Sequence, residues 1–106
     1  MVGPKRRLSK ASTSVLAAMY EAAPDARYGM ELMDAARAPS GTLYPILARF
    51  RDWGWLIAER EDIDPATAGR PARTYYRLTS QGLTESRALL PQEAFAGRPS
   101  WAGGDA

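Results

Sequence analysis

Side chains that can hydrogen-bond phosphates and base edges concentrate in two stretches of the chain. In the first stretch these side chains belong to Ser40, Thr42, Tyr44 and Arg49. Hydroxyl and guanidinium groups are among the groups that most often contact DNA phosphates and base edges. The second stretch, residues 70–77, holds three arginines and no acid. These residue types, grouped in this way, favour binding of a polyanion over catalysis.

The chain contains neither cysteine nor histidine. The lack of cysteine excludes disulfides, thiolate zinc sites and cysteine nucleophiles. The lack of histidine excludes Ser-His-Asp chemistry, histidine metal ligands and histidine general bases. The sequence also has no glycine-rich phosphate loop or nucleotide-binding fingerprint. We therefore expect a protein that is not an enzyme and uses no metal or cofactor, and the cysteine-free composition fits a cytoplasmic location.

The net charge of +2 hides an uneven distribution. Residues 1–11 contain four bases and no acid, residues 56–69 contain four acids and one base, and residues 70–77 contain three bases and no acid. Two basic patches thus flank an acidic segment, and basic patches can meet the phosphates of a nucleic acid. The plainer alternative is that the arginines only keep the surface soluble, and charge alone does not decide between the two.

The length of 106 residues indicates one domain with a modest core. Residues 1–11 lack apolar periodicity, so we expect a flexible basic arm there. Residues 97–106 include three glycines and a proline, so we expect a flexible tail. The domain itself is expected over residues 12–96. Its apolar runs are too short for a membrane span or a secretory signal.

Apolar residues at helical spacing predict two helices, over residues 13–23 and roughly 28–36. Ser12 or Thr13 can cap the first helix. Pro24 and Pro39 mark where the two helices end, because the residue before a proline avoids the helical conformation. The inward-facing residues are expected to be Leu16, Met19, Tyr20 and Ala23 in the first helix, and Tyr28, Leu32 and either Ala35 or Ala36 in the second.

A third helix is expected over residues 42–53, followed by Gly54 as a left-handed stop. Its apolar stripe is Leu43, Ile46, Leu47 and Phe50. Pro45 decides where the helix begins, because an interior proline clashes with the carbonyl four residues earlier, here that of Gly41. With Thr42 as the cap, Pro45 falls in the first turn, where its missing N–H costs nothing. We therefore expect a tight Ser40-Gly41 turn and a regular helix from Leu43.

Two strands, residues 55–62 and 72–79, are expected next, joined by a long loop with two prolines and a glycine. Thr79 or Ser80 can cap a last helix. Pro91 either interrupts this helix or starts a short new helix that carries Phe95. Three helices, a two-stranded hairpin and a further helix follow the order of a winged helix-turn-helix. The predicted fold is therefore mainly α with a two-stranded β hairpin.

The motifs on these elements resemble those of the PadR family of bacterial transcriptional regulators. The matching segments are Tyr28-Gly29-Met30-Glu31-Leu32, Ser40-Gly41-Thr42-Leu43-Tyr44-Pro45-Ile46-Leu47, Gly54-Trp55-Leu56-Ile57 and Gly69-Arg70-Pro71-Ala72-Arg73-Thr74-Tyr75-Tyr76-Arg77-Leu78-Thr79, followed by Gly82. The resemblance covers about residues 13–90. It implies a homodimeric regulator, usually a repressor, that binds a palindromic operator in double-stranded DNA. Some small members also sense a planar aromatic or drug-like effector at the dimer interface.

The resemblance also implies which residues contact DNA. They lie on the recognition helix, residues 42–53, and on the wing, residues 62–73. The expected DNA-binding residues are Ser40, Thr42, Tyr44, Pro45, Arg49, Arg70 and Arg73. The Tyr44 hydroxyl can reach a phosphate or a base edge, and its ring can touch a thymine methyl group. Direct readout is expected from Thr42, Tyr44 and Arg49. Backbone anchoring is expected from Ser40, Arg70, Arg73 and the basic arm.

Arg49 and Arg51 lie two residues apart on the third helix, so they face different directions. We expect one of them to face DNA and the other to pair with an acid such as Asp52 or Glu59. Arg49 is favoured for DNA because it lies just over one turn beyond Tyr44.

The hairpin arginines have two interpretations. They can bind phosphates or the minor groove, or they can form ion pairs with the acids of residues 59–62 on the facing strand. We assign the ion pair to Arg77. We assign DNA contact to Arg70 and Arg73, because these two lie nearer the hairpin tip.

Two features depart from the family pattern. The connection between the second and third helices is only residues 37–39, and the last helix is short and broken by Pro91. In the family, C-terminal helices build much of the dimer interface, so dimerisation here relies on the first helix and the arm or is weak. A second function class stays open, a winged-helix protein-interaction or adaptor module of plasmid or phage assembly or segregation that binds no operator. A monomer that ignores DNA would favour it.

Overall fold

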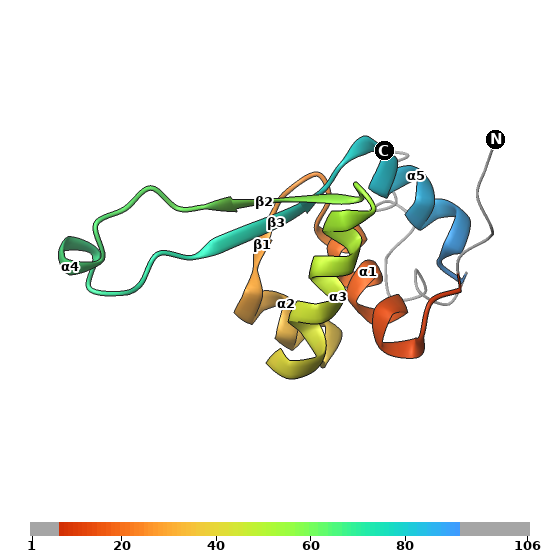
Figure 1. Ribbon diagram of the computed structural model, residues 1–106, viewed down its shortest axis with the longest axis horizontal. Coiled ribbons are helices and arrows are strands. Elements are labelled where there is room, and N and C mark those ends of the chain that lie inside the picture. Colours follow the sequence, from red (N-terminus) through yellow and green to blue (C-terminus); the bar gives the residue numbers. More distant parts are fainter. Residues whose placement is uncertain (1–6, 92–106) are drawn as a thin grey trace.

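The computed structural model describes residues 7–91, which form five helices and three strands around one core (Figure 1). In chain order these elements are α1 (Lys10–Ala22), β1 (Arg27–Tyr28), α2 (Gly29–Ala36), α3 (Ser40–Asp52), β2 (Leu56–Arg60), α4 (Pro65–Ala68), β3 (Thr74–Leu78) and α5 (Ser80–Leu89). The predicted tail over residues 97–106, the position of Phe95 and most of the basic arm lie outside the described residues.

Four helices, α1, α2, α3 and α5, gather into a body, and the β2–β3 hairpin projects from it with α4 at the far tip (Figure 1). The last helix ends at Leu89, just before Pro91, as the sequence predicts. This arrangement confirms the predicted mainly α winged-helix fold. Within residues 7–91, no helix has the length and apolar character that a membrane crossing requires.

Helix α1 begins at Lys10 rather than at Thr13, so the predicted start and cap are wrong. The cap is Ser9, whose Oγ accepts a hydrogen bond from the Ser12 N–H at 3.1 Å. The earlier start adds a turn whose inner side chains, Ala11 and the buried Ser12, lie toward the core. Residues 9–11, predicted to belong to the arm, are therefore part of the folded domain.

Helix α3 begins at Ser40, so the predicted Ser40-Gly41 turn is also wrong. The Pro39 carbonyl accepts hydrogen bonds from the N–H groups of both Thr42 and Leu43, each at 2.9 Å. These bonds close the first helical turn before Pro45, which then lies inside the helix and removes the usual donor for the Gly41 carbonyl. Gly41 is exposed, so water can reach that carbonyl and the helix tolerates the proline.

A short set of contacts fixes the end of α3 to the start of α5. Gly54 follows α3 with φ +80°, which confirms the predicted left-handed stop. Thr79 caps α5, because its Oγ1 accepts from the Gly82 N–H at 3.0 Å while donating to the Gly54 carbonyl at 2.7 Å. A Cβ atom on Gly82 would overlap the Trp55 carbonyl oxygen, so glycine is required for this close approach. The contacts hold the base of the hairpin against the recognition helix.

The sheet has three strands in the order β1-β3-β2, and both neighbouring pairs are antiparallel. The hairpin is predicted correctly, with Leu56 opposite Leu78 at its base. The third strand, β1, is absent from the prediction because two residues are too few to show a period-two pattern. Its Tyr28 lies opposite Tyr75 of β3. Strand β1 thereby ties the start of α2 to the wing.

The core lies between the inner faces of α1, α2 and α3 and the base of the hairpin. Its buried apolar residues are Val15, Leu16, Ala18, Met19, Leu32, Ala36, Ala38, Leu43, Ile46, Leu47, Phe50, Trp55, Leu56, Leu78 and Leu90. The predicted stripe of α3 is buried in full, whereas Ala35 of α2 is exposed and Ala36 takes the inner position. Because the core occupies the inner face of α3, the outer face of that helix is left for contacts with other molecules.

Candidate nucleic-acid interface

The outer face of α3 is open to solvent over its whole length. Its exposed residues are Ser40, Gly41, Tyr44, Pro45, Ala48, Arg49, Arg51 and Asp52. Most of them recur three or four positions apart, opposite the buried stripe. Of the five residues predicted to contact DNA from this helix, Thr42 alone is half-buried. In the described part of the chain, Arg49 forms no ion pair, so its charge is available to an anion.

The N-terminus of α3 carries no negative charge of its own. Its cap residue, Pro39, provides no side-chain hydrogen bond, and the first turn contains no acid. The leading N–H groups of a helix lack acceptors inside the helix and form the positive end of its dipole. The hydroxyl of Ser40 lies at the same end. This end of α3 therefore suits a phosphate group.

Tyr44 lies against the start of α2. A Cβ atom on Gly29 would overlap the Tyr44 hydroxyl oxygen, so the ring packs directly on the glycine backbone. The Tyr44 side chain still keeps 44% of its surface exposed. Gly29, from the motif of residues 28–32, thus positions Tyr44, from the motif of residues 40–47. Tyr44 is held in place on one side and available for contact on the other.

A cleft of about 500 Å³ separates the starts of α2 and α3 from the hairpin. Met30 and Met33 line it from α2, Tyr44 from α3, and Arg73 and Tyr76 from the hairpin side. The recognition helix and the wing therefore form the two walls of one concave surface. Two of the predicted α3 residues, Ser40 and Tyr44, line this cleft. The predicted wing arginines, Arg70 and Arg73, also line it, although some 30 residues separate the two sets in sequence.

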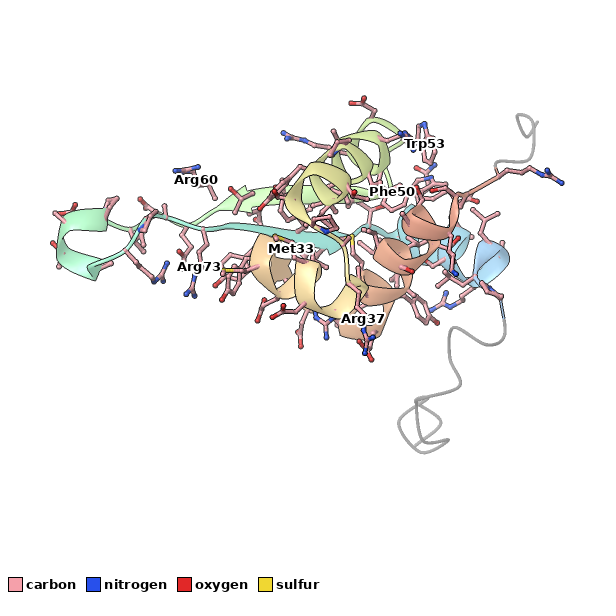
Figure 2. The ribbon with its side chains drawn as sticks, turned by 90° about the horizontal axis from the view of Figure 1, so that it is seen from below. Met33, Arg37, Phe50, Trp53, Arg60 and Arg73 are labelled. Atoms are coloured by element: carbon pink, nitrogen blue, oxygen red, sulfur yellow. The ribbon has the colours of Figure 1, made fainter. Side chains whose placement is uncertain are left out.

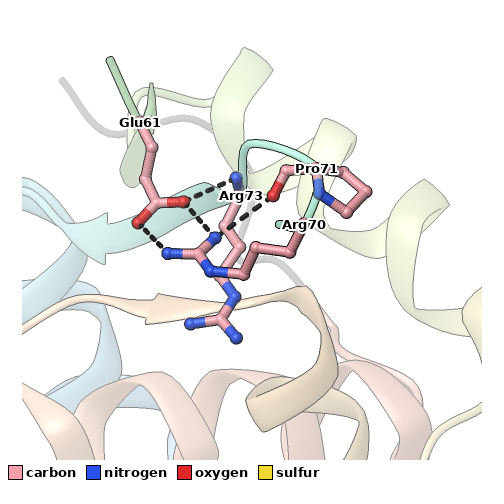
Figure 3. A network of polar contacts seen from close by, with 4 residues as sticks. All are labelled: Glu61, Arg70, Pro71 and Arg73. Atoms are coloured by element: carbon pink, nitrogen blue, oxygen red, sulfur yellow. Dashed lines mark hydrogen bonds and ion pairs between the residues drawn. The ribbon is translucent and has the colours of Figure 1, made fainter. Parts of the chain in front are cut away.

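We call residues 60, 61 and 70–74 the wing neck and residues 62–69 the wing tip. At the neck, Glu61 joins the two sides of the hairpin (Figure 3). Its carboxylate accepts hydrogen bonds from Arg70 Nη1 at 2.7 Å, from Arg70 Nη2 at 3.0 Å and from the Arg73 backbone N–H at 2.9 Å. The Glu61 N–H donates in turn to the Arg73 carbonyl at 2.8 Å. Glu61 is thus the centre of a closed polar network.

These contacts change the acidity of both partners. The hydrogen bonds from Arg70, and next the backbone N–H of Arg73, hold the pKa of the Glu61 carboxyl at about 2, below its ordinary value of 4.5. The hydrogen bond to Glu61 raises the pKa of Arg70. Both groups are therefore charged at neutral pH. Of the two interpretations of Arg70, the structure shows the ion pair with the facing strand.

Arg73 is held differently from Arg70. Its guanidinium lies over the Tyr28 ring, with Cζ 4.2 Å from the ring centroid, in a cation–π arrangement. Tyr28 in turn meets the edge of Tyr75, with ring centroids 5.5 Å apart. Over residues 7–91, the Arg73 side chain has no acid within ion-pair distance. Its charge is therefore positioned at the cleft without being neutralised.

Arg77 pairs with Glu59 at 3.6 Å, as the cross-strand interpretation predicts. The predicted pairing of Arg51 with Asp52 or Glu59 is wrong for the part of the chain that the structure describes. Glu59 is engaged by Arg77, and adjacent residues of a helix such as Arg51 and Asp52 point apart. Arg51 instead lies near Tyr76, whose pKa is raised by burial and then by Tyr44, and lowered by Arg51.

Two exposed side chains near this surface were not predicted from the sequence: Met30, which lines the cleft, and Arg60, which does not. Arg60 ends β2 within the acidic segment, which masks it in a count of charges, and Figure 2 shows it on the opposite side of the hairpin from Arg73. Met30, 66% exposed at the start of α2, lies off the helix stripe that points to the core. A strand or helix periodicity test on each residue would have shown both to face outward.

The wing tip differs in charge from the wing neck. It contains Asp62 and Asp64 and no base. Asp64 caps the short helix α4, since its carboxylate accepts from the Ala66 N–H at 3.1 Å and from the Thr67 hydroxyl at 2.9 Å. The predicted DNA-binding wing, residues 62–73, is therefore divided into an acidic tip and a basic neck, and the neck is the part that suits phosphates.

Known transcriptional regulators resemble this chain in sequence pattern and in fold. The sequence pattern of the transcriptional regulator PadR-like family matches residues 16–88. A similar solved structure is that of a candidate DNA-binding protein from Ralstonia eutropha JMP134, 20% identical with a TM-score of 0.63, aligned over 80% of this chain and 100% of that one. Another is a PadR-like transcription factor from Bacteroides fragilis, 26% identical with a TM-score of 0.56, aligned over 74% of this chain and 81% of that one.

The structure of overoxidized AbfR bound to DNA is also similar, with 22% identity and a TM-score of 0.61 over 85% of this chain. The present chain spans 59% of the length of that AbfR chain. No significant match was found among curated protein sequences. The structural likenesses support the winged-helix fold, and the sequence pattern defines the family.

Proposed function

The chain belongs to the PadR-like family of transcriptional regulators, and from this premise we propose that it is a repressor that binds double-stranded DNA sequence-specifically. The observation that carries the proposal is the open outer face of α3, which lies beside a cleft whose other wall bears Arg73. A helix of this kind fits the major groove while the wing follows the backbone. The DNA-bound structure of AbfR adds support from a protein with the same fold.

We assign base readout to Thr42, Tyr44 and Arg49, with Pro45 in contact with the groove wall. Arginine and hydroxyl side chains can recognise base edges, and the tyrosine ring can touch a thymine methyl group. Phosphate contacts are assigned to Ser40 at the positive end of α3 and to Arg73 at the neck. The half-buried position of Thr42 limits it to a contact made through its hydroxyl at the helix start.

A homodimer would present two α3 helices to a palindromic operator. Half-sites of such operators lie about one helical turn, or a multiple of it, apart. Repression then follows from occupation of DNA that the transcription machinery needs. A small planar aromatic effector, as in some small members of the family, would act by changing the spacing of the two helices.

The test is binding of labelled duplex DNA from the region upstream of the gene, against a scrambled duplex of equal length. Fluorescence anisotropy is followed from about 50 mM to about 200 mM salt, a range over which phosphate contacts weaken steeply. We expect binding that resists scrambled competitor and falls with salt. Absence of binding at the lowest salt would contradict the proposal, and a monomeric mass in the same solution would then favour the adaptor module.

A further inference from the structure

The Glu61–Arg70 pair suggests how the strength of DNA binding is limited. We propose that Glu61 is a positioning residue that holds the Arg70 guanidinium away from DNA phosphates and so lowers the sequence-independent affinity of the protein. The inference rests on the DNA binding proposed above. It concerns the wing neck, whereas sequence readout is assigned to α3.

Three hydrogen bonds already engage the terminal nitrogens of the Arg70 guanidinium. Both terminal nitrogens of its guanidinium donate to the two carboxylate oxygens of Glu61, and Nη1 also donates to the Pro71 carbonyl at 3.1 Å (Figure 3). A phosphate group presents two oxygens in nearly the same geometry as a carboxylate. Glu61 and a phosphate would therefore compete for the same edge of Arg70.

Arg73 provides an internal comparison, because it lies three residues from Arg70 in the same neck. Glu61 accepts a hydrogen bond from its backbone N–H and leaves its guanidinium over Tyr28. The Glu61 carboxylate thus binds different parts of the two arginines. It occupies the side chain of Arg70 and orders the backbone of Arg73, whose own side chain stays available.

The pair is stable near neutral pH and yet open to exchange. The pKa of the Glu61 carboxyl is about 2, so protonation does not release Arg70 under ordinary conditions. The side chains keep 35% (Arg70) and 18% (Glu61) of their surface exposed, so a phosphate can approach the guanidinium. If Arg70 bound a DNA phosphate, its hydrogen bonds to Glu61 would have to break. The Glu61 carboxylate would then lie unpaired beside DNA, whose negative charge repels it.

Replacement of Glu61 by glutamine is a mild change at this site. The glutamine oxygen can still accept from the Arg73 N–H, and the bond from the residue 61 N–H to the Arg73 carbonyl is a backbone contact. The amide loses the charge that holds Arg70. Asp62→Asn is the matched control, since it removes the same charge one residue away where the described residues show no ion pair with an arginine.

The experiment measures the association constant for a random-sequence duplex against salt for five proteins. These are the wild type, Glu61→Gln, Arg70→Gln, the double variant and Asp62→Asn. A released arginine that gains one phosphate contact steepens the slope of log K against log salt by about 0.9, which corresponds to about eightfold tighter binding at 0.1 M salt. We expect this change in Glu61→Gln alone. Arg70→Gln, the double variant and Asp62→Asn should keep a slope close to that of the wild type.

A purely structural role for Glu61 gives a different pattern, in which Glu61→Gln weakens binding with an unchanged slope. That result would overturn the inference, as would a slope reduced by about 0.9 in Arg70→Gln, because Arg70 would then contact phosphate in the wild type. A wild type that binds no duplex at low salt would overturn the proposed function and this inference together. Wild-type binding with an unchanged Glu61→Gln slope would overturn this inference alone. Thermal unfolding of each variant confirms that the proteins compared are folded.

Discussion

The recognition helix and the hairpin both carry arginines, but the structure uses the two sets differently. On α3, Arg49 is exposed and forms no ion pair with the residues that the structure describes. At the hairpin, Arg70 is bound by Glu61 and Arg77 by Glu59, across the two strands. Arg77 and Glu59 are diagonal neighbours on paired strands. Diagonal neighbours lie about 7–8 Å apart, within reach of long side chains, so a hairpin brings bases and acids together in a way that an outer helix face does not.

A count of arginines in the sequence therefore overstates the positive charge that a wing offers to DNA. Residues 70–77 look like a basic patch in the sequence, but two of its three arginines have acidic partners. Arg73 avoids neutralisation because the Tyr28 ring, rather than a carboxylate, holds it. We infer that α3 supplies the sequence-dependent part of binding and that the neck supplies a small, adjustable phosphate contact.

Replacement of Tyr44 by alanine should have the largest effect on the difference in affinity between the preferred site and a random duplex. A side chain that reads bases contributes roughly 1–3 kcal/mol of discrimination, so affinity for the preferred site should fall about 5- to 150-fold. Affinity for a random duplex should change little. Tyr44→Phe keeps the ring and removes the hydroxyl that lies nearest Gly29, so it separates the role of the hydroxyl from that of the ring. If an anisotropy titration shows the same loss of affinity for both duplexes, Tyr44 contacts the DNA backbone and not the bases.

Arg73→Gln should come next, with about eightfold weaker binding for every duplex at 0.1 M salt and a salt slope reduced by about 0.9. The reason is that a free guanidinium at the cleft contacts phosphate whatever the sequence. Arg77→Gln serves as the control, since Glu59 already engages that side chain. A loss of affinity restricted to one duplex sequence would show that Arg73 reads bases. That result would contradict the assignment of sequence readout to α3 and of phosphate contacts to the neck.

Gly29→Ala should produce a smaller effect on sequence discrimination, up to about tenfold, without any change on α3 itself. The added methyl group occupies the space of the Tyr44 hydroxyl, so the ring must shift. Because the displaced atom ends a half-exposed side chain, the unfolding temperature should stay nearly constant. Titration of preferred and random duplexes checks the expectation. Unchanged discrimination would show that the packing of Tyr44 on α2 does not matter for readout.

Titration of Glu61 should leave DNA binding unaffected near neutral pH. Its folded pKa of about 2 lies below the ordinary 4.5, so its contribution to the stability of the neck is complete above pH 4.5 and is lost as pH falls toward 2. Carboxyl carbon shifts measured by NMR should show a midpoint near 2 for this residue. A midpoint near 4.5 would mean that Arg70 is not held in solution, and the contrast between Arg70 and Arg73 would disappear.

Features fixed by local pattern are the ones that the sequence predicts well. The α3 stripe of Leu43, Ile46, Leu47 and Phe50 is regular, and Gly54 marks its end by a conformation that glycine adopts easily. The hairpin follows from two apolar runs around a proline-rich loop. In these cases one short segment contains the whole physical cause.

Features fixed by competition between neighbours are less predictable. Several residues before α1 could cap it, and Ser9 prevails because an earlier start lets Ser12 turn inward. The start of α3 depends on the Pro39 carbonyl, which accepts two hydrogen bonds and places Pro45 inside the helix. The partner of Arg70 depends on the register of the hairpin, which no single segment reveals.

The central claim is that α3 reads sequence in double-stranded DNA, and selection from a duplex library tests it most directly. Wild type and Tyr44→Ala are compared in the same selection, with bound molecules sequenced after each round. The account predicts a palindromic motif for the wild type, with half-sites about one helical turn apart, and loss of that motif for the variant. No enriched motif for the wild type, or the same motif for both proteins, would contradict it.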